Sequence, residues 1–232
     1  MEVELKLILS YDSHYKFRTL FREFQTSNSF YHNLFFDNET QFLRASKSRL
    51  RLRMVQDLHP DEIFGEKEEE YLYTDAIVCV KSKGKWHQDV HSVEEIETHI
   101  DPSLAKMMIE NPANFETLDI PPIEKIKTLA EHVPFAEFVQ LADFENTRKC
   151  FKIPHFPHLV FELDESVFPN GERRYELEVE FSAEDASEES MAIKEFLDSH
   201  DIEYEPATTS KSGRLWSILG LKNKKKKRNK RN

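Results

Sequence analysis

The chain has 232 residues, of which 39% are hydrophobic and 12% aromatic, which suits one ordinary domain with a buried core and excludes a disordered chain. Two cysteines, Cys79 and Cys150, are too few for a disulfide framework or a thiolate metal site, so a reducing compartment is expected. The formal net charge is -11, and the tail from Lys222 to Asn232 holds eight of the 32 basic residues. The remainder carries 24 basic against 43 acidic residues and should repel nucleic acid, so any phosphate ligand must meet a local positive cluster.

The sequence shows no targeting or membrane segment. No apolar run approaches the roughly 18 residues that a membrane span needs, and the start MEVELKL is unlike a signal or transit peptide. We therefore expect a soluble, cytoplasmic protein. We also expect a monomer.

The N-terminal half mixes strands and helices. Residues 2–9 alternate charged and apolar side chains, which predicts a strand, and residues 12–24 carry apolar side chains at helical spacing. The acidic stretch 57–71 contains Pro60 and Gly65 and is interpreted as a solvated loop. Further strands are predicted at 30–36, 48–55, 76–81 and from 86 to about 96, the last two joined at Lys83-Gly84.

The C-terminal half adds a helix at 101–110 and a region that four prolines break into short helices and turns. Later elements are strands at 138–153, 159–165 and 173–181, a hairpin turn at Asn170-Gly171, an amphipathic helix at 183–200 and a last strand from about 208 to 218. The final KNKKKKRNKRN cannot form a core. We expect one domain over residues 1–218 and a disordered basic tail over 219–232.

Several predicted strands place charged side chains on one face and apolar side chains on the other. The charged sets are Glu2, Glu4 and Lys6, then Arg49, Arg51 and Arg53, then Glu176, Glu178 and Glu180. Burying such charges without partners costs several kcal/mol each, so they indicate a hydrated tunnel in which charges are paired or bound to ions. The alternative is that these charged faces are the solvent-exposed faces of half-buried strands. This explains any one strand, but for all three strands it requires that the acidic and basic side chains are segregated by chance.

The charged sets indicate a polyphosphate site. Glutamate oxygens are hard ligands that suit Mg²⁺ or Mn²⁺ held together with substrate phosphates. An opposing basic wall would bind phosphate oxygens through Lys6, Arg49, Arg51, Arg53, Lys81, Arg148 and Lys211. With only five glycines the chain has no P-loop or dinucleotide fingerprint, and it has no serine-hydrolase elbow or H-E-x-x-H motif. Side chains must therefore hold the phosphates.

These motifs resemble those of the CYTH, or triphosphate tunnel metalloenzyme, superfamily. Glu2-Val3-Glu4-Leu5-Lys6 is similar to its E-x-E-x-K signature, and the resemblance spans residues 1 to 218, closest to small eukaryotic members of the plant tripolyphosphatase type. The other matching segments are N-L-F-F-D at 33–37, L-R-L-R at 50–53, V-C-V-K at 78–81, N-T-R at 146–148, Y-E-L-E-V-E at 175–180 and S-K at 210–211. The resemblance implies an α+β fold, an eight-stranded antiparallel β-barrel tunnel with flanking helices.

The resemblance also implies roles for named residues, with Mg²⁺ or Mn²⁺ as cofactor. They are Glu2, Glu4 and Glu178 for catalysis, Lys6, Arg51, Arg53, Lys81, Arg148 and Lys211 for substrate, and Glu2, Glu4, Glu94, Glu176, Glu178 and Glu180 for metal. One strand departs from the family, because residues 92–97 read S-V-E-E-I-E where an R-x-E-x-E pattern is usual. Glu94 is the predicted inward acid, with Glu95 and Glu97 as alternatives if the strand bulges.

The implied activity is metal-dependent hydrolysis of inorganic tripolyphosphate to pyrophosphate and phosphate. Thiamine triphosphate and nucleoside or RNA 5′-triphosphates are alternative substrates, and no feature identifies the nucleoside pocket of a cyclase. The missing arginine also motivates a non-enzymatic alternative, a silent polyphosphate-binding protein. The tail could contact nucleic acid or acidic surfaces, or act as a nuclear address. His91 is interpreted as solvent-facing and is assigned no role.

Overall fold

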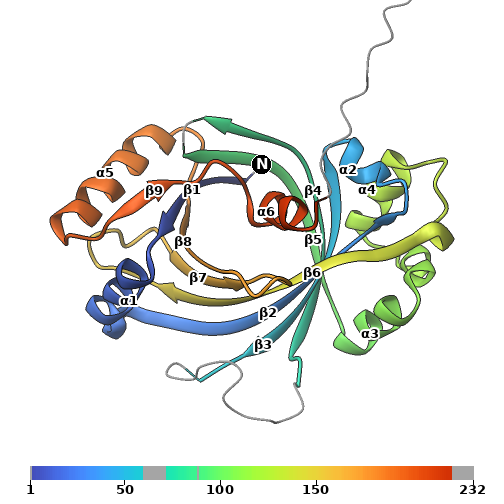
Figure 1. The fold of residues 1–232 in the computed structure, drawn as a ribbon, viewed down its shortest axis with the longest axis horizontal. Coiled ribbons are helices and arrows are strands. Elements are labelled where there is room, and N and C mark those ends of the chain that lie inside the picture. The colour runs from blue at the N-terminus through green and yellow to red at the C-terminus, as the bar shows by residue number, and fades with distance from the viewer. Residues whose placement is uncertain (1, 60–71, 88, 221–232) are drawn as a thin grey trace, which may run out of the picture.

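The computed structural model describes residues 2–59, 72–87 and 89–220. Its centre is a closed antiparallel barrel, seen end-on in Figure 1, in which β1 pairs with β8 on one side and with β5 on the other. The barrel strands are β1 (Glu2–Leu9), β2 (Gln25–Asn38), β3 (Ser48–Asp57), β4 (Asp75–His87), β5 (Val90–Ile100), β6 (Phe138–Phe151), β7 (Phe161–Val167) and β8 (Arg173–Glu180). They follow the order β5-β4-β3-β2-β6-β7-β8-β1, and the short β9 (Tyr204–Pro206) pairs with the end of β1. The predicted eight-stranded barrel is thereby confirmed.

Helices flank the barrel on two sides (Figure 1). Among them, α1 begins after an N-cap, Ser10, whose hydroxyl accepts a hydrogen bond from the Ser13 N–H, and α3 uses Asp101 in the same way. The helices are α1 (Tyr11–Leu20), α2 (Phe42–Ala45), α3 (Pro102–Glu110), α4 (Pro121–Leu129), α5 (Ala186–Ser199) and α6 (Lys211–Ile218), with 3₁₀ turns η1 (Arg22–Phe24), η2 (Pro112–Thr117) and η3 (Phe135–Glu137). No described helix combines the length and apolar character that crossing a membrane requires.

The two larger hydrophobic clusters lie outside the barrel, between its wall and the helices. Outward side chains of β1, such as Leu5 and Leu7, pack with Phe17 of α1 and Ile193 of α5. On the opposite side, outward residues of β3 and β4 pack against α3 and α4 in a second cluster. Each fully buried side chain of this size contributes about 1.5–3 kcal/mol. The flanking clusters therefore stabilise the fold and leave the barrel interior free for charged side chains.

The C-terminal strand predicted near residues 208–218 is wrong. This segment forms α6, whose N-cap Ser210 accepts a hydrogen bond from the Gly213 N–H. Leu215 of α6 packs with Phe35 and Phe144 of the barrel wall, so the helix closes over one mouth of the barrel (Figure 1). The helix is favoured because the cap satisfies a backbone donor and the buried face repeats at helical rather than strand spacing.

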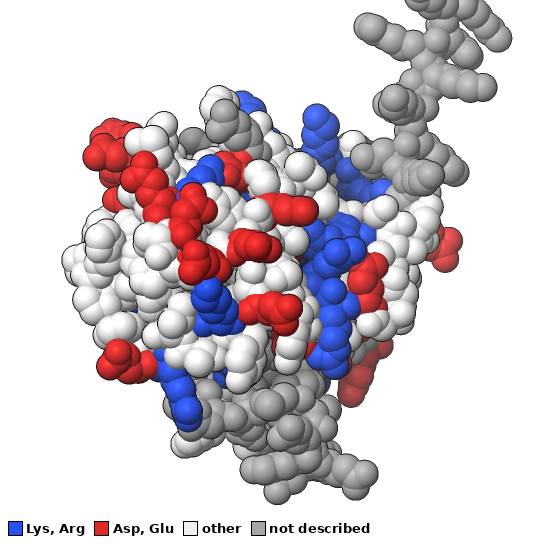
Figure 2. Space-filling model, turned by 60° about the vertical axis from the view of Figure 1, so that its left-hand side comes forward, with Lys and Arg blue, Asp and Glu red and all other residues white. Residues whose placement is uncertain are grey.

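Smaller differences concern element ends. The first helix ends at Leu20 and is followed by η1 rather than running to residue 24. Strand β4 does not turn at Lys83-Gly84 but continues to His87, with a register shift between Ser82 and Lys85. Of the predicted loop, residues 60–71 lie outside the described residues, as do residues 221–232 of the predicted tail. On the face drawn in Figure 2, basic side chains form a stripe in the right half, and acidic side chains predominate in the left half, where basic side chains lie among them.

Candidate functional site

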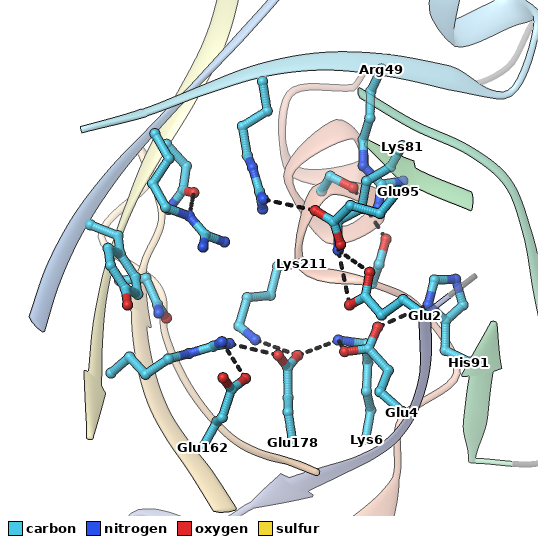
Figure 3. A pocket seen from close by; sticks show the side chains of 18 of the residues that line it. Glu2, Glu4, Lys6, Arg49, Lys81, His91, Glu95, Glu162, Glu178 and Lys211 are labelled. Carbon is cyan, nitrogen blue, oxygen red and sulfur yellow. Dashed lines mark hydrogen bonds and ion pairs between the residues drawn. The ribbon is translucent and has the colours of Figure 1, made fainter. Parts of the chain in front are cut away.

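The barrel encloses a cavity of about 480 Å³ that charged side chains from seven strands and α6 line (Figure 3). It brings together the predicted residues Glu2, Glu4, Lys6, Arg49, Arg51, Arg53, Lys81, Arg148, Glu178, Glu180 and Lys211. Further lining residues include Tyr31, Asn33, His91, Glu95, Glu97, Asn146 and Glu162. Charged residues that are up to 209 positions apart in sequence thus converge in one cavity, which requires them to neutralise one another or to bind ions.

Glu178 of β8 is the most heavily paired acid of the cavity. Its carboxylate contacts Lys6, lies 2.6 Å from the Lys211 Nζ and lies 2.7 Å from the Arg148 Nη2. Burial alone would raise the pKa of Glu178, but Lys211, Lys6 and Arg148 together hold that pKa well below its usual value. Glu178 is therefore a fixed negative charge that orients three cations toward the cavity.

Lys211 at the start of α6 joins the helix to the barrel. Its Nζ lies 2.7 Å from the Asp164 Oδ2 and 2.9 Å from the Glu176 Oε2, in addition to Glu178. Burial would lower the pKa of Lys211, but Asp164, Glu176 and Glu178 outweigh it and raise that pKa. Glu176 lies on the same face of β8 as Glu178 but is not among the residues that line the cavity, and its carboxylate pairs with Lys211 and Arg214. The prediction that Glu176 is a metal ligand is thus not supported by its position.

Three carboxylates at one end of the cavity could hold a metal ion. Glu2, Glu4 and Glu180 each offer an oxygen, and these oxygens lie within 4.8 Å of one another. Burial alone would raise the pKa of Glu4, but the positive charge of Lys6 and other partners outweigh it and lower this pKa to about 2. Burial and a hydrogen bond with Glu95 raise the pKa of Glu2 to about 8. Hard oxygen donors in this number fit Mg²⁺ or Mn²⁺, which complete their coordination with water or phosphate. We call Glu2, Glu4 and Glu180 the acidic triad.

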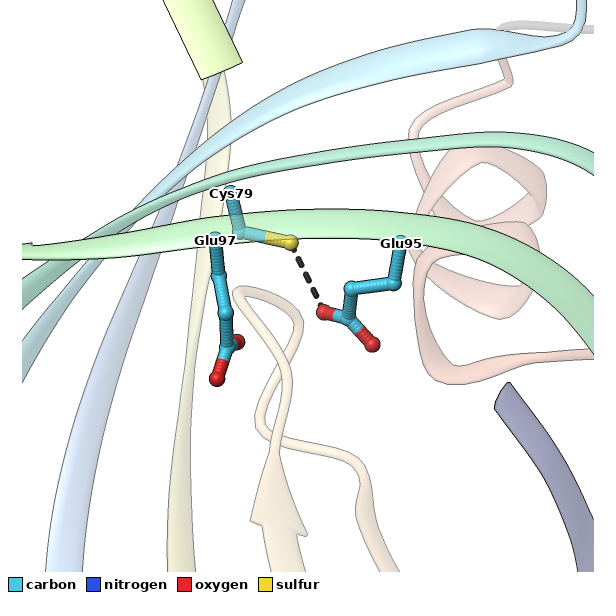
Figure 4. A group of neighbouring side chains, drawn as sticks. All are labelled: Cys79, Glu95 and Glu97. Atoms are coloured by element: carbon cyan, nitrogen blue, oxygen red, sulfur yellow. Dashed lines mark hydrogen bonds between the residues drawn. The ribbon is translucent and has the colours of Figure 1, made fainter. Parts of the chain in front are cut away.

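A second group, Cys79, Glu95 and Glu97, is a weaker candidate for a metal (Figure 4). The Cys79 Sγ donates a hydrogen bond of 2.8 Å to the Glu95 Oε1, and burial raises the pKa of this thiol. A protonated thiol is a poor metal ligand. Glu95 also lies 2.5 Å from the Lys81 Nζ and 3.3 Å from the Arg51 Nη2, so two cations already neutralise it.

The structure corrects the choice of Glu94 as the inward acid of β5. Because Glu2 pairs with Val93 and Glu4 with His91, the positions that face the cavity are the odd-numbered ones, which include Glu95. The Glu94 side chain is 41% exposed on the outer face and lies 2.8 Å from the Lys83 Nζ. Glu95 and Glu97 therefore correspond to the two acids of the R-x-E-x-E pattern, and Val93 occupies the place of its arginine.

The opposite wall carries three arginines of β3, which we call the arginine row: Arg49, Arg51 and Arg53. Arg51 pairs with Glu95, but its buried Nε has no hydrogen-bond partner among the described residues. Arg53 donates to the Asn33 Oδ1 and lies over the Tyr31 ring at 4.6 Å. No carboxylate in the described part of the chain is in ion-pair contact with Arg49 or Arg53, and burial lowers the pKa of both. Incompletely neutralised guanidinium groups facing a cavity favour an anionic ligand.

Sequence reasoning did not identify the acids of β7. Glu162 and Asp164 follow the same alternation as the first strand, F-E-L-D, and that pattern could have identified them. Asp164 is buried between Arg148 and Lys211. Burial raises the pKa of Glu162 to about 7 despite its contact with Arg148. The interior therefore holds more buried acid than the predicted set.

Comparisons with known proteins agree with this geometry. The CYTH domain matches residues 1–212. A plant protein from Hippeastrum, described as a candidate adenylyl cyclase with a dominant triphosphatase activity, is 26% identical over 94% of this chain and 96% of that chain, with a TM-score of 0.80. Two further structures share the fold. A protein from Bacillus halodurans is 19% identical over 93% of this chain and 97% of that chain, with a TM-score of 0.64. A protein from Pyrococcus horikoshii is 15% identical over 96% of this chain and 100% of that chain, with a TM-score of 0.55. No curated protein sequence matches the chain.

Proposed function

Because the chain belongs to the CYTH domain family, we propose that its tunnel hydrolyses a triphosphate with the help of Mg²⁺ or Mn²⁺. The substrate we propose is inorganic tripolyphosphate, which water would convert to pyrophosphate and phosphate. One observation carries the proposal: the arginine row, with two guanidinium groups that lack carboxylate partners among the described residues, faces the acidic triad across one cavity. The activity described for the Hippeastrum protein supports it.

The charge distribution of the cavity suits a metal and a polyanion together. The lining holds seven basic and seven acidic residues, so its formal net charge is zero. The arginine row and the acidic triad nevertheless lie on different parts of the wall. A divalent ion on the acidic triad would make the cavity net positive. The next ligand to enter should then be an anion with several charges, spaced to reach from the triad to the arginine row.

The residues divide into positioning and electrostatic roles. The arginine row and Lys81 would grip phosphate oxygens, since guanidinium groups form paired hydrogen bonds with them. Glu2, Glu4 and Glu180 would hold the ion, which when bound neutralises charge on the phosphate oxygens. Lys6, Arg148 and Lys211, fixed by Glu178, stabilise charge that develops as the terminal phosphorus–oxygen bond breaks. Water forms the new bond, and pyrophosphate leaves.

The direct test measures phosphate release. The full chain is incubated with tripolyphosphate, thiamine triphosphate, ATP or pyrophosphate, each with Mg²⁺, Mn²⁺ or EDTA. We expect phosphate from tripolyphosphate only when the metal is present, and little from pyrophosphate. Preferential hydrolysis of thiamine triphosphate or ATP would replace the proposed substrate, while binding of tripolyphosphate without release would identify a silent binding protein.

Arg53→Met should weaken tripolyphosphate binding and leave the unliganded protein at least as stable. Losing a charge-assisted hydrogen bond costs about 1.5–3 kcal/mol of binding, roughly a tenfold to hundredfold rise in Kd. Removing an incompletely paired buried cation is often neutral or stabilising. Calorimetric titration with tripolyphosphate and thermal unfolding measure both effects.

The matched control is Arg18→Met. Arg18 lies over the Tyr15 ring at 5.2 Å on α1, so it loses a similar aromatic contact outside the cavity. Its Kd should not change. A lower unfolding temperature with unchanged binding in Arg53→Met would show that Arg53 supports the fold and not the ligand.

A further inference from the structure

His91 of β5 is a buried member of the cavity wall, not the solvent-facing residue that its sequence suggests. The residue is only 4% exposed. Its Nδ1 lies 3.1 Å from the Glu4 Oε1, and Figure 3 shows the imidazole beside this carboxylate. The other oxygen of this carboxylate lies 2.8 Å from the Lys6 Nζ, and an ionised carboxylate paired in this way only accepts hydrogen bonds, so we assign the imidazole Nδ1 as the donor.

The neighbouring strand β4 is shaped around this imidazole. Its register shifts between Ser82 and Lys85, and within that irregularity Lys83 adopts a positive φ of 56°. A Cβ atom added to Gly84 would lie 2.9 Å from the His91 Nε2, so only glycine permits this approach. The Trp86 ring covers the imidazole with a centroid distance of 4.6 Å. The bulge and the indole ring therefore fix the orientation of the imidazole.

The fixed imidazole in turn restrains Glu4. The Glu4 Oε2 lies 2.8 Å from the Lys6 Nζ, so His91 and Lys6 each hold one oxygen of the same carboxylate. An ionised carboxylate offers about four acceptor sites, so acceptor sites remain on both oxygens. The Nε2 of His91 faces Gly84 and is not available as a ligand itself. His91 thus contacts the acidic triad only through Glu4.

We propose that His91 is a positioning residue that orients the Glu4 carboxylate for a divalent cation. The inference rests on the proposed function, which makes Glu4 a metal ligand. Partners that orient metal ligands typically change metal affinity by about 10–100-fold when they are removed. In this chain Gly84 and Trp86 fix the His91 imidazole, and the imidazole in turn orients the Glu4 carboxylate.

The test compares two substitutions of similar size. His91→Asn keeps an N–H donor near the place of Nδ1, whereas His91→Leu removes the donor. Affinity for Mn²⁺ alone is measured from the electron paramagnetic resonance signal of free Mn²⁺, and KM and kcat are measured with tripolyphosphate. We expect about 10–100-fold weaker Mn²⁺ binding in His91→Leu and affinity close to the unchanged protein in His91→Asn.

Two further variants keep the test decisive. Gly84→Ala should displace the imidazole and weaken Mn²⁺ binding, but add nothing in a His91→Leu background, because both changes act through one contact. Glu4→Gln is the reference for loss of the ligand. If Glu4→Gln loses Mn²⁺ and His91→Leu binds normally, the inference about His91 is overturned and the proposed function stands. If Glu4→Gln itself binds Mn²⁺ normally, the metal assignment fails and the inference fails with it.

Discussion

Glu4→Gln should lower kcat/KM for tripolyphosphate by at least about a hundredfold while the protein stays folded. The substitution preserves the shape of the side chain but removes the negative charge from the acidic triad, where an ion would be held. Lys6 keeps its contact with Glu178, so the loss of one partner should not unfold the barrel. Phosphate release across a Mg²⁺ titration measures the rate and the half-saturating metal concentration, and thermal unfolding measures the fold.

Glu94→Gln is the matched control for this experiment. Glu94 lies on the same strand as Glu95 but points outward to Lys83. Its substitution makes the same chemical change without altering the cavity, so the turnover should be unchanged. Equal rates for Glu4→Gln and the unchanged protein would remove Glu4 from the site, and a strong loss in Glu94→Gln would show that β5 turns its even-numbered side chains toward the cavity.

Lys211→Met should destabilise the fold by about 3–5 kcal/mol, which is the usual cost of breaking a buried ion pair by removing one partner. The lysine contacts Asp164, Glu176 and Glu178, and each of these buried carboxylates would lose one of its cations. Urea unfolding at neutral pH measures the change in the free energy of unfolding. Lys106→Met, which changes an exposed lysine of α3, should lie within about 0.5 kcal/mol of the unchanged protein.

The Lys211→Met effect should depend on pH in a defined direction. In the unchanged protein, the depressed pKa of Glu178 contributes stability above the pH at which an unfolded glutamate ionises, and this contribution is lost as the pH falls. In the variant the carboxylate pKa values rise, so the acids take up protons at higher pH. The difference in unfolding free energy should therefore be largest near neutral pH and shrink as the pH falls toward and below 4.5, the ordinary pKa of a glutamate. A difference that is constant with pH would mean that Lys211 acts through packing.

The sequence was sufficient where the two faces of a strand differ in chemistry. In β1 and β3, charged and apolar side chains alternate without exception over the central residues, so the inward set follows from the period of the strand. Their places in one cavity agree with that prediction. The roles of these residues in binding and catalysis stay predictions.

The sequence was insufficient where both faces carry the same chemistry. Residues 92–97 place acids at even and odd positions, so their own pattern cannot choose between Glu94 and Glu95. The choice is made by β1, whose Glu2 pairs with Val93. In the same way, the segment from Ser210 to Ile218 was interpreted as a strand, although Ser210 caps a helix and Gly213 approaches Thr209 too closely for a side chain. Lys211 nevertheless lines the cavity, as predicted, because α6 begins at the mouth of the barrel.

The joint between β1 and β5 closes the barrel with few bonds. The described residues contribute four pairs there, from Glu2 with Val93 to Leu5 with Val90, whereas β2 and β6 pair along most of their length. The two strands are also distant in the chain, so this seam requires the closure of a long loop, which is slow and entropically costly. Glu4 and His91 face each other across the seam. An ion bound beside them would hold the two strands together. Adding the metal should therefore slow amide hydrogen exchange more at the β1–β5 pairing than in the other strands of the barrel.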